Sequence, residues 1–106
     1  MEVFKHGFTT SSVIITETQP GGGPPLHARS TEEVHLLLDG RMRYVVGEQR
    51  FEASGPYIVN IPAETPHAFI NAGDVPLRLI CFFPNPEVLA AQWRVGPNPL
   101  LVDTTE

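Results

Sequence analysis

The sequence is poor in cysteine, in basic residues and in long apolar runs. Cys81 is the only cysteine among 106 residues, so no disulfide can form within the chain. Seven basic residues stand against twelve acidic ones, giving a net charge of −5, which argues against binding to nucleic acid or to an acidic membrane. No apolar stretch reaches the length of a membrane span, and the amino terminus, MEVFKHGFTT, lacks the apolar centre of a signal peptide. We therefore expect a cytoplasmic protein.

Turn residues, in contrast, are frequent along the whole chain. Eleven prolines and nine glycines separate short segments rich in Val, Ile, Leu, Phe and Thr. This pattern is typical of an all-β sandwich or barrel. The length predicts one domain over residues 1–106, with no repeat or linker. The segments predict strands at 12–18, 26–29, 33–39, 41–46, 49–53, 57–61, 66–71 and 76–83.

The connections between these strands also carry local signals. Asp39–Gly40 predicts a hairpin turn, Gly47–Glu48 a second one, and residues 71–76 a third turn. A short helix is predicted over 85–93, because Asn85 suits a helix cap and is followed by a proline. The tail at 94–106 is predicted to be extended or loosely attached.

The predicted strand at 33–39 has two different faces. One face is polar and then apolar, and consists of Glu33, His35 and Leu37. The other is apolar throughout, and consists of Val34, Leu36 and Leu38. In a small barrel the first face would line the interior. The second would need cover from another layer, such as an N-terminal strand, or from a second subunit, so we predict a homodimer.

Three pairs of residues, each pair two positions apart and containing at least one possible metal ligand, lie on three predicted strands. They are His27 and Arg29, Glu33 and His35, and His67 and Phe69. Side chains two apart on a strand point the same way, so a barrel could bring the three pairs together. Two imidazoles and one carboxylate form a facial triad suited to divalent iron, manganese, nickel or zinc. The sequence therefore predicts one divalent transition metal.

The same residues resemble the two motifs of the cupin superfamily. The matching positions are Gly21, His27, Glu33 and Gly40 in the first motif, and Pro62, His67 and Asn71 in the second. The chain is similar to small single-domain cupins of the quercetin-dioxygenase-like type. The resemblance implies a double-stranded β-helix, which is a jelly-roll barrel. It also implies a metal at His27, Glu33 and His67. The family contains dioxygenases, isomerases and non-catalytic proteins, so the fold does not choose the reaction.

Three positions depart from the family pattern. Arg29 replaces the second histidine, Glu64 replaces a glycine, and Gly55 is one residue too far from Pro62. The last two departures predict only local changes of turn geometry. Arg29 affects function, because a guanidinium has no lone pair to offer a metal.

The missing histidine leaves three alternatives open. In the first, His35 takes the vacant ligand position beside His27, Glu33 and His67. In the second, these three residues bind the metal alone, and His35 is a supporting partner or general base. In the third alternative no metal binds, and Arg29 pairs with Glu33 or Glu32. With a metal present, like-charge repulsion predicts that Arg29 points away from it.

The functional alternatives follow from these sites. The first is a metal-dependent cupin with an apolar pocket, acting on a small organic molecule by dioxygenase-type oxidation. His35 or Glu33 would be the base, Arg29 would grip an acidic group of the substrate, and Phe69 would belong to the core and the pocket wall. The alternatives are a metal-dependent isomerase or cyclase, and a non-catalytic protein that binds a small acidic ligand.

Overall fold

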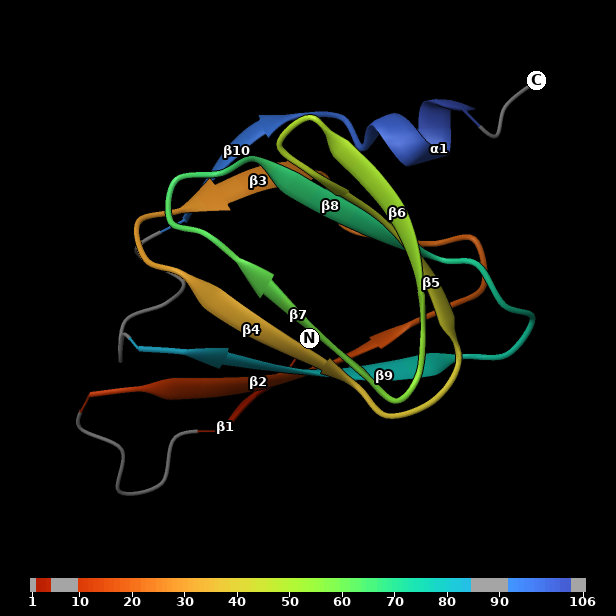
Figure 1. Cartoon of the computed structure of the whole chain (residues 1–106), viewed down its shortest axis with the longest axis horizontal. Helices are drawn as coiled ribbons and strands as arrows, with labels where there is room; N and C mark the ends of the chain where they lie inside the picture. Colours follow the sequence, from red (N-terminus) through yellow and green to blue (C-terminus); the bar gives the residue numbers. More distant parts are fainter. Residues whose placement is uncertain (1, 5–9, 85–91, 104–106) are drawn as a thin grey trace.

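The computed structural model describes residues 2–4, 10–84 and 92–103, which form a nearly all-β domain (Figure 1). Its elements are β1 (Glu2–Phe4), β2 (Ser12–Thr18), β3 (Leu26–Arg29), β4 (Glu33–Leu37), β5 (Arg41–Val46), β6 (Gln49–Ser54), β7 (Tyr57–Ile61), β8 (His67–Asn71), β9 (Leu77–Phe83), β10 (Gln92–Gly96) and α1 (Pro99–Asp103). All the predicted strands occur as β2 to β9, with ends within about two residues. The sequence did not predict β1 and β10.

The strands form two antiparallel sheets that face each other (Figure 1). The first sheet has the order β1-β2-β9-β4-β7, and the second sheet has the order β10-β3-β8-β5-β6. Between them lies a core of apolar side chains that includes Ile14, Leu37, Met42, Tyr44, Ile61 and Leu79. The prediction of an all-β jelly-roll barrel is confirmed. So is the inward face of β4, where Glu33, His35 and Leu37 are all buried.

The predicted hairpin at Asp39–Gly40 is wrong, because this turn joins the two sheets. β4 pairs with β7 and β9 in the first sheet, whereas β5 pairs with β6 and β8 in the second. Gly40 still has the positive φ of 92° that its turn signal implies. The corner is tightly packed: a Cβ on Gly55 would lie 2.5 Å from the Asp39 Cα. The sequence therefore predicted the turn, but it did not predict that β5, which follows the turn, would pair with β6 and β8 instead of β4.

The second turn, at Gly47–Glu48, is the predicted hairpin. It joins β5 to β6, and Val46 pairs directly with Gln49 across it. Gly47 has a φ of 58°, a left-handed conformation that glycine adopts without steric cost.

The chain end differs from the prediction. Residues 85–91 of the predicted helix lie outside the described residues, and the prediction is wrong for Gln92 and Trp93, which belong to β10. In the tail, residues 94–96 are extended as predicted, because they belong to β10. The next segment is neither extended nor loose: α1 follows, capped by Asn98, whose Oδ1 accepts a hydrogen bond of 2.9 Å from the Leu100 N–H. Residues 104–106 lie outside the described residues. Leu100 is buried against the second sheet beside Val45. In the described part of the chain, no helix is long and apolar enough to span a membrane.

The outward faces of the two sheets differ. Helix α1 packs against β8 and β5 on the second sheet. The first sheet turns outward two cross-strand rows of apolar residues, which we call the outer apolar face: Val13, Phe82 and Val34, and Ile15, Ile80, Leu36 and Ile58. Ile58 is 65% exposed and Phe82 is 45% exposed. The N-terminal strand does not cover this face, because β1 pairs with β2 at the edge of the same sheet.

Candidate metal centre

Three strands from both sheets bring the predicted ligands together. His27 on β3 is the direct cross-strand partner of His67 on β8, in the second sheet. Glu33 comes from β4 in the opposite sheet and is 1% exposed. One potential ligand atom from each of these residues lies within 4.8 Å of the others. The structure therefore assembles the triad that the spacing predicted, at a point where the two sheets face each other.

Backbone hydrogen bonds orient both histidine rings. His27 Nδ1 donates to the Pro25 carbonyl at 2.8 Å, and His67 Nδ1 donates to the Thr65 carbonyl at 2.9 Å. A carbonyl can only accept, so in each neutral ring Nε2 carries the lone pair. Burial lowers the pKa of His27 to about 4, which keeps this ring neutral at pH 7. Both Nε2 atoms can therefore offer a lone pair to a cation.

An unsatisfied contact marks the centre of the site. Glu33 Oε1 lies against His67 Nε2, yet neither buried atom has a hydrogen-bond partner. Burial alone would raise the pKa of Glu33, but the neighbouring imidazoles of His35 and His67 hold that pKa well below its usual range. A carboxylate oxygen and a nitrogen lone pair that face each other in a buried site are costly unless a cation lies between them. A divalent metal meets this requirement, so these residues fit one.

Arg29 points toward the triad in this structure; the expectation that it points away applies to the metal-bound site and stays a prediction. Its Nη1 donates to Glu33 Oε2 at 2.8 Å and lies 3.1 Å from His27 Nε2, while Nη2 donates to Gln92 Oε1 at 2.7 Å. The guanidinium also lies 4.8 Å from the centre of the Phe83 ring. Glu33 has two oxygens, and the one turned away from His67 forms a charge-assisted hydrogen bond with this guanidinium.

This position has a consequence for metal binding. The lone pair of His27 Nε2 points at an N–H of Arg29. A metal at this nitrogen therefore requires Nη1 to move off it, while Glu33 Oε2 and Gln92 Oε1 can remain its partners. The ion pair between Arg29 and Glu33 is also the pairing that the metal-free alternative predicted.

His35 lies beside the triad rather than within it. Its Nε2 is 3.6 Å from Glu33 Oε1, and its Nδ1 is 3.1 Å from the Tyr44 hydroxyl. The ring is 2% exposed, and burial lowers its pKa. A neutral imidazole next to Glu33, with a hydroxyl behind it, is suited to hold or move a proton in the interior.

A small cavity adjoins the triad inside the barrel. It has a volume of about 70 Å³ and is lined by Ile14, Thr16, Pro24, His27, Arg29, His35, Phe69, Cys81 and Phe83. Phe69 belongs to the core and also forms a wall of this cavity, with its ring 5.9 Å from that of His35. Cys81 is buried, and burial raises the pKa of its thiol, so it fills the core and is no nucleophile at pH 7.

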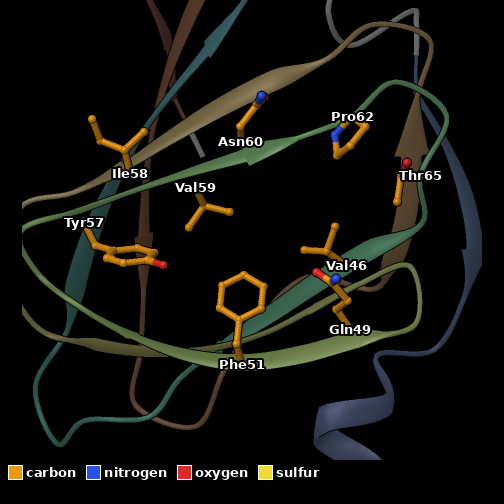
Figure 2. Close-up of a pocket in the computed structure, with 9 residues that line it drawn as sticks. All are labelled: Val46, Gln49, Phe51, Tyr57, Ile58, Val59, Asn60, Pro62 and Thr65. Carbon is orange, nitrogen blue, oxygen red and sulfur yellow. The ribbon is translucent and has the colours of Figure 1, made fainter.

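A larger cavity of about 650 Å³ lies elsewhere, between the edge strands β6 and β7. Figure 2 shows Phe51 and Val59 facing each other across it. None of the predicted metal or substrate residues lines this cavity. The predicted site residues therefore lie at or beside the triad and not in the larger cavity.

One departure from the second motif and one match to it also have structural explanations. Glu64 stands where the family has glycine, and its φ is 62°, in the left-handed region that glycine favours. Its N–H donates to the Arg29 carbonyl at 2.7 Å. Asn71 is structural: its Nδ2 donates to the carbonyls of Thr18 and Val75, and so holds the turn after β8.

Sequence reasoning missed two polar residues next to the triad, Gln92 and Arg94. Both lie on β10, opposite Arg29 and His27 respectively. The alternation of Gln92, Trp93, Arg94 and Val95 is a strand pattern, but the apparent cap at Asn85 favoured a helix up to residue 93.

The chain belongs to the cupin domain family, whose model matches residues 14–83. This confirms the resemblance based on the two motifs. A curated relative, an uncharacterized protein of Methanocaldococcus jannaschii, is 37% identical over 57 residues, which are 53% of this chain and 46% of the relative.

Solved oxalate decarboxylases have the same fold. The enzyme from Lactobacillus farciminis, in a formate complex, matches with a TM-score of 0.74 and 26% identity over 91% of this chain and 31% of its own. The enzyme from Bacillus subtilis, a protein with Mn(II) centres, matches with a TM-score of 0.74 and 22% identity over 81% of this chain and 24% of its own. The chain thus spans less than half the length of each of these proteins.

Proposed function

We propose that this cupin binds one divalent transition metal through His27, Glu33 and His67 and acts on a small organic acid. The observation that carries the proposal is the buried contact of Glu33 Oε1 with His67 Nε2, two atoms without hydrogen-bond partners. Three protein ligands leave coordination positions open for a substrate. When bound, the metal would supply Lewis-acid or redox chemistry, and iron, manganese, nickel and zinc all suit these ligands.

The other residues have separate roles in this proposal. Arg29 binds an anionic group of the substrate, since its guanidinium reaches both the triad and the cavity. His35 moves a proton at Nε2, next to Glu33 and away from bulk water. Phe69 forms an apolar wall against the substrate. The formate complex of the Lactobacillus farciminis enzyme, which shares this fold, supports a small acid as the ligand.

We infer dioxygenase-type oxidation as the reaction class, with metal-dependent isomerisation or cyclisation as the alternative. Open coordination positions beside a small apolar cavity suit a reaction from which water is excluded. Oxygen uptake by the metal-loaded protein, measured with an oxygen electrode over a set of small organic acids, divides the two classes. A location in the cytoplasm stays a prediction.

Metal content is the decisive test. Protein purified without added metal is analysed by inductively coupled plasma mass spectrometry, and then titrated with Mn²⁺ and Zn²⁺. We expect about one ion per chain for the wild type, and loss of the ion in His67→Ala. His35→Gln is the matched control, because His35 is an equally buried histidine that lies outside the triad. If His67→Ala retains the ion in a folded protein, the ligand assignment is wrong; if His35→Gln loses it, His35 is a fourth ligand.

A second candidate function has one observation in its favour. The ion pair between Arg29 and Glu33 satisfies both charges without a metal, as expected of a non-catalytic protein that binds an acidic ligand. Absence of bound metal in the wild type, together with binding of small carboxylates, would favour this function over the enzyme.

We also propose that the protein is a homodimer. The outer apolar face is uncovered in the described part of the chain, whereas α1 covers the second sheet. A second copy could place its own outer apolar face against this one, since a two-fold axis makes a surface complementary to itself.

A further inference from the structure

A second hollow opens next to the metal centre, and we call it the mouth. It has a volume of about 370 Å³ and is lined by Pro24, Pro25, His27, Arg29, Gln92, Trp93 and Arg94. His27 and Arg29 also line the cavity inside the barrel. The mouth therefore leads from the surface to the triad along the inner side of β3 and β10, which lie side by side at one edge of the second sheet (Figure 1).

The register of β10 determines which side chains face the mouth. Gln92 stands opposite Arg29, and Arg94 stands opposite His27. Directly opposed residues of antiparallel strands share a face, and diagonal neighbours lie about 7 to 8 Å apart. Arg94 is exposed and Arg29 is buried. One guanidinium thus lies at the entrance and a second lies further in, next to the triad.

The charge of the mouth is opposite to that of the chain. The whole protein carries a net charge of −5, yet the mouth is lined by two arginines, and none of the described residues that line it is an aspartate or glutamate. The charge of Arg29 is matched by Glu33. No described residue forms an ion pair with Arg94. A cationic hollow in an otherwise acidic protein attracts anions and raises their local concentration.

We propose that Arg94 determines substrate specificity by binding the carboxylate of a small organic acid between its own guanidinium and that of Arg29. This inference rests on the proposed function for the position of the reacting centre, and it adds a residue on β10. Gln92 is a positioning residue, because its Oε1 holds Arg29 Nη2 at 2.7 Å. A planar guanidinium fixed in this way presents its remaining N–H groups to a carboxylate in a defined plane.

The size of the site restricts the acid. The cavity beyond Arg29 has a volume of only about 70 Å³, and Ile14, Phe69 and Phe83 are among the residues that line it. Only a short apolar group fits there, while the carboxylate remains in the wider and polar mouth. The ligand class is therefore a short-chain carboxylic acid, with its charged end at Arg94 and its apolar end toward the triad.

Binding of simple acids tests this assignment. Acetate, propionate and malonate are titrated by calorimetry into zinc-loaded protein and into chelator-treated protein, with propionamide and inorganic phosphate as comparison probes. We expect at least one of the three acids to bind. Arg94→Gln should weaken that binding about tenfold, or about 1.4 kcal/mol, which is the scale of one charge-assisted hydrogen bond at a partly exposed position. The affinity of Arg94→Lys for the acid should lie between those of the wild type and Arg94→Gln, because lysine keeps the positive charge but loses the bidentate geometry of the guanidinium.

Arg78→Gln is the matched control. Arg78 is also an exposed arginine on a strand, but it lies on β9 opposite Glu17, in the first sheet. The variant Arg78→Gln should leave acid binding unchanged. Both Arg78→Gln and Arg94→Gln should keep the metal content and the midpoint of thermal unfolding of the wild type. The inference is overturned if no acid binds, if Arg94→Gln binds the acids as tightly as the wild type, or if propionamide or phosphate binds equally well.

The two proposals fail in different ways. If the protein holds no metal but binds the acids in an Arg94-dependent manner, the metal-dependent function is wrong and the role of Arg94 stands. If metal binds at the triad but acid binding does not depend on Arg94, the role of Arg94 is wrong and the metal centre stands.

Discussion

Replacing Arg29 by methionine should strongly destabilise the metal-free protein at pH 7. Arg29 and Glu33 form an ion pair of 2.8 Å with side chains 8% and 1% exposed, so the variant leaves a buried carboxylate without its counter-ion. At an effective dielectric constant of about 20, unit charges about 4 Å apart attract each other by about 4 kcal/mol. Breaking a buried pair costs about 3 to 5 kcal/mol.

Protonation of Glu33 sets an upper limit to this cost. A carboxyl group with an ordinary pKa near 4.3 is protonated at pH 7 at a cost of about 1.36 kcal/mol per pH unit, or about 3.7 kcal/mol. We therefore expect a loss of about 3 kcal/mol, which lowers the midpoint of thermal unfolding by about 10 to 20 °C. Because the variant raises the folded-state pKa of Glu33, its deficit should shrink as the pH falls from 7 towards 5.

A thermodynamic cycle in urea, with a chelator present, measures the effect. The double variant Arg29→Met/Glu33→Gln should recover most of the loss, because it removes both charges. A bound divalent metal should also reduce the loss, since it supplies the missing positive charge. The exposed pair Arg43–Glu52, with its atoms 4.0 Å apart, is the matched control and should couple by less than about 1 kcal/mol. A coupling energy for Arg29 and Glu33 no larger than that of this control would refute the reasoning.

Three further predictions concern pH, backbone strain and assembly. Metal-free wild type should lose stability between pH 6.5 and pH 4, on the order of 1 kcal/mol of it through His27, because His27 has a pKa of about 4 in the folded protein and unfolded histidine takes up its proton first. His27→Gln should reduce this slope in urea titrations, and His35 and Glu33, whose pKa values are also lowered, account for the remaining slope. Glu64→Gly should raise stability by up to about 1 kcal/mol by chemical denaturation, because φ is 62° at this position. Ile58→Glu should convert the dimer to a monomer in sedimentation velocity, because Ile58 is 65% exposed on the outer apolar face.

Each of these predictions has an outcome that contradicts it. A pH slope that is unchanged in His27→Gln would assign the proton uptake to other groups. A loss of stability in Glu64→Gly would mean that the glutamate side chain contributes more than the left-handed backbone costs. A wild type that sediments as a monomer, or an Ile58→Glu variant that stays a dimer, would exclude the outer apolar face as the interface. Ser54→Glu, at an exposed position of β6 in the second sheet, is the control for Ile58→Glu.

The strands and the triad could be predicted from the sequence because both depend on local spacing. A strand alternates its side chains with a period of two, so the inward face of Glu33, His35 and Leu37 follows from the order of residues alone. The motif spacing likewise identified His27 and His67. Turn conformation was also local: Gly40 and Gly47 both have the positive φ that their dipeptides imply.

Only the tertiary structure decided which segments meet. Gly40 and Gly47 look alike in sequence, yet one turn changes sheet and the other closes a hairpin, because β4 takes its partners from β7 and β9. The orientation of Arg29 depended on where β4 places the second oxygen of Glu33. Arg94 lies opposite His27 only because β10 pairs with β3 across a long sequence separation. Hydrogen bonding between distant strands and the balance of buried charges are properties of the assembled barrel, and no local window of residues contains them.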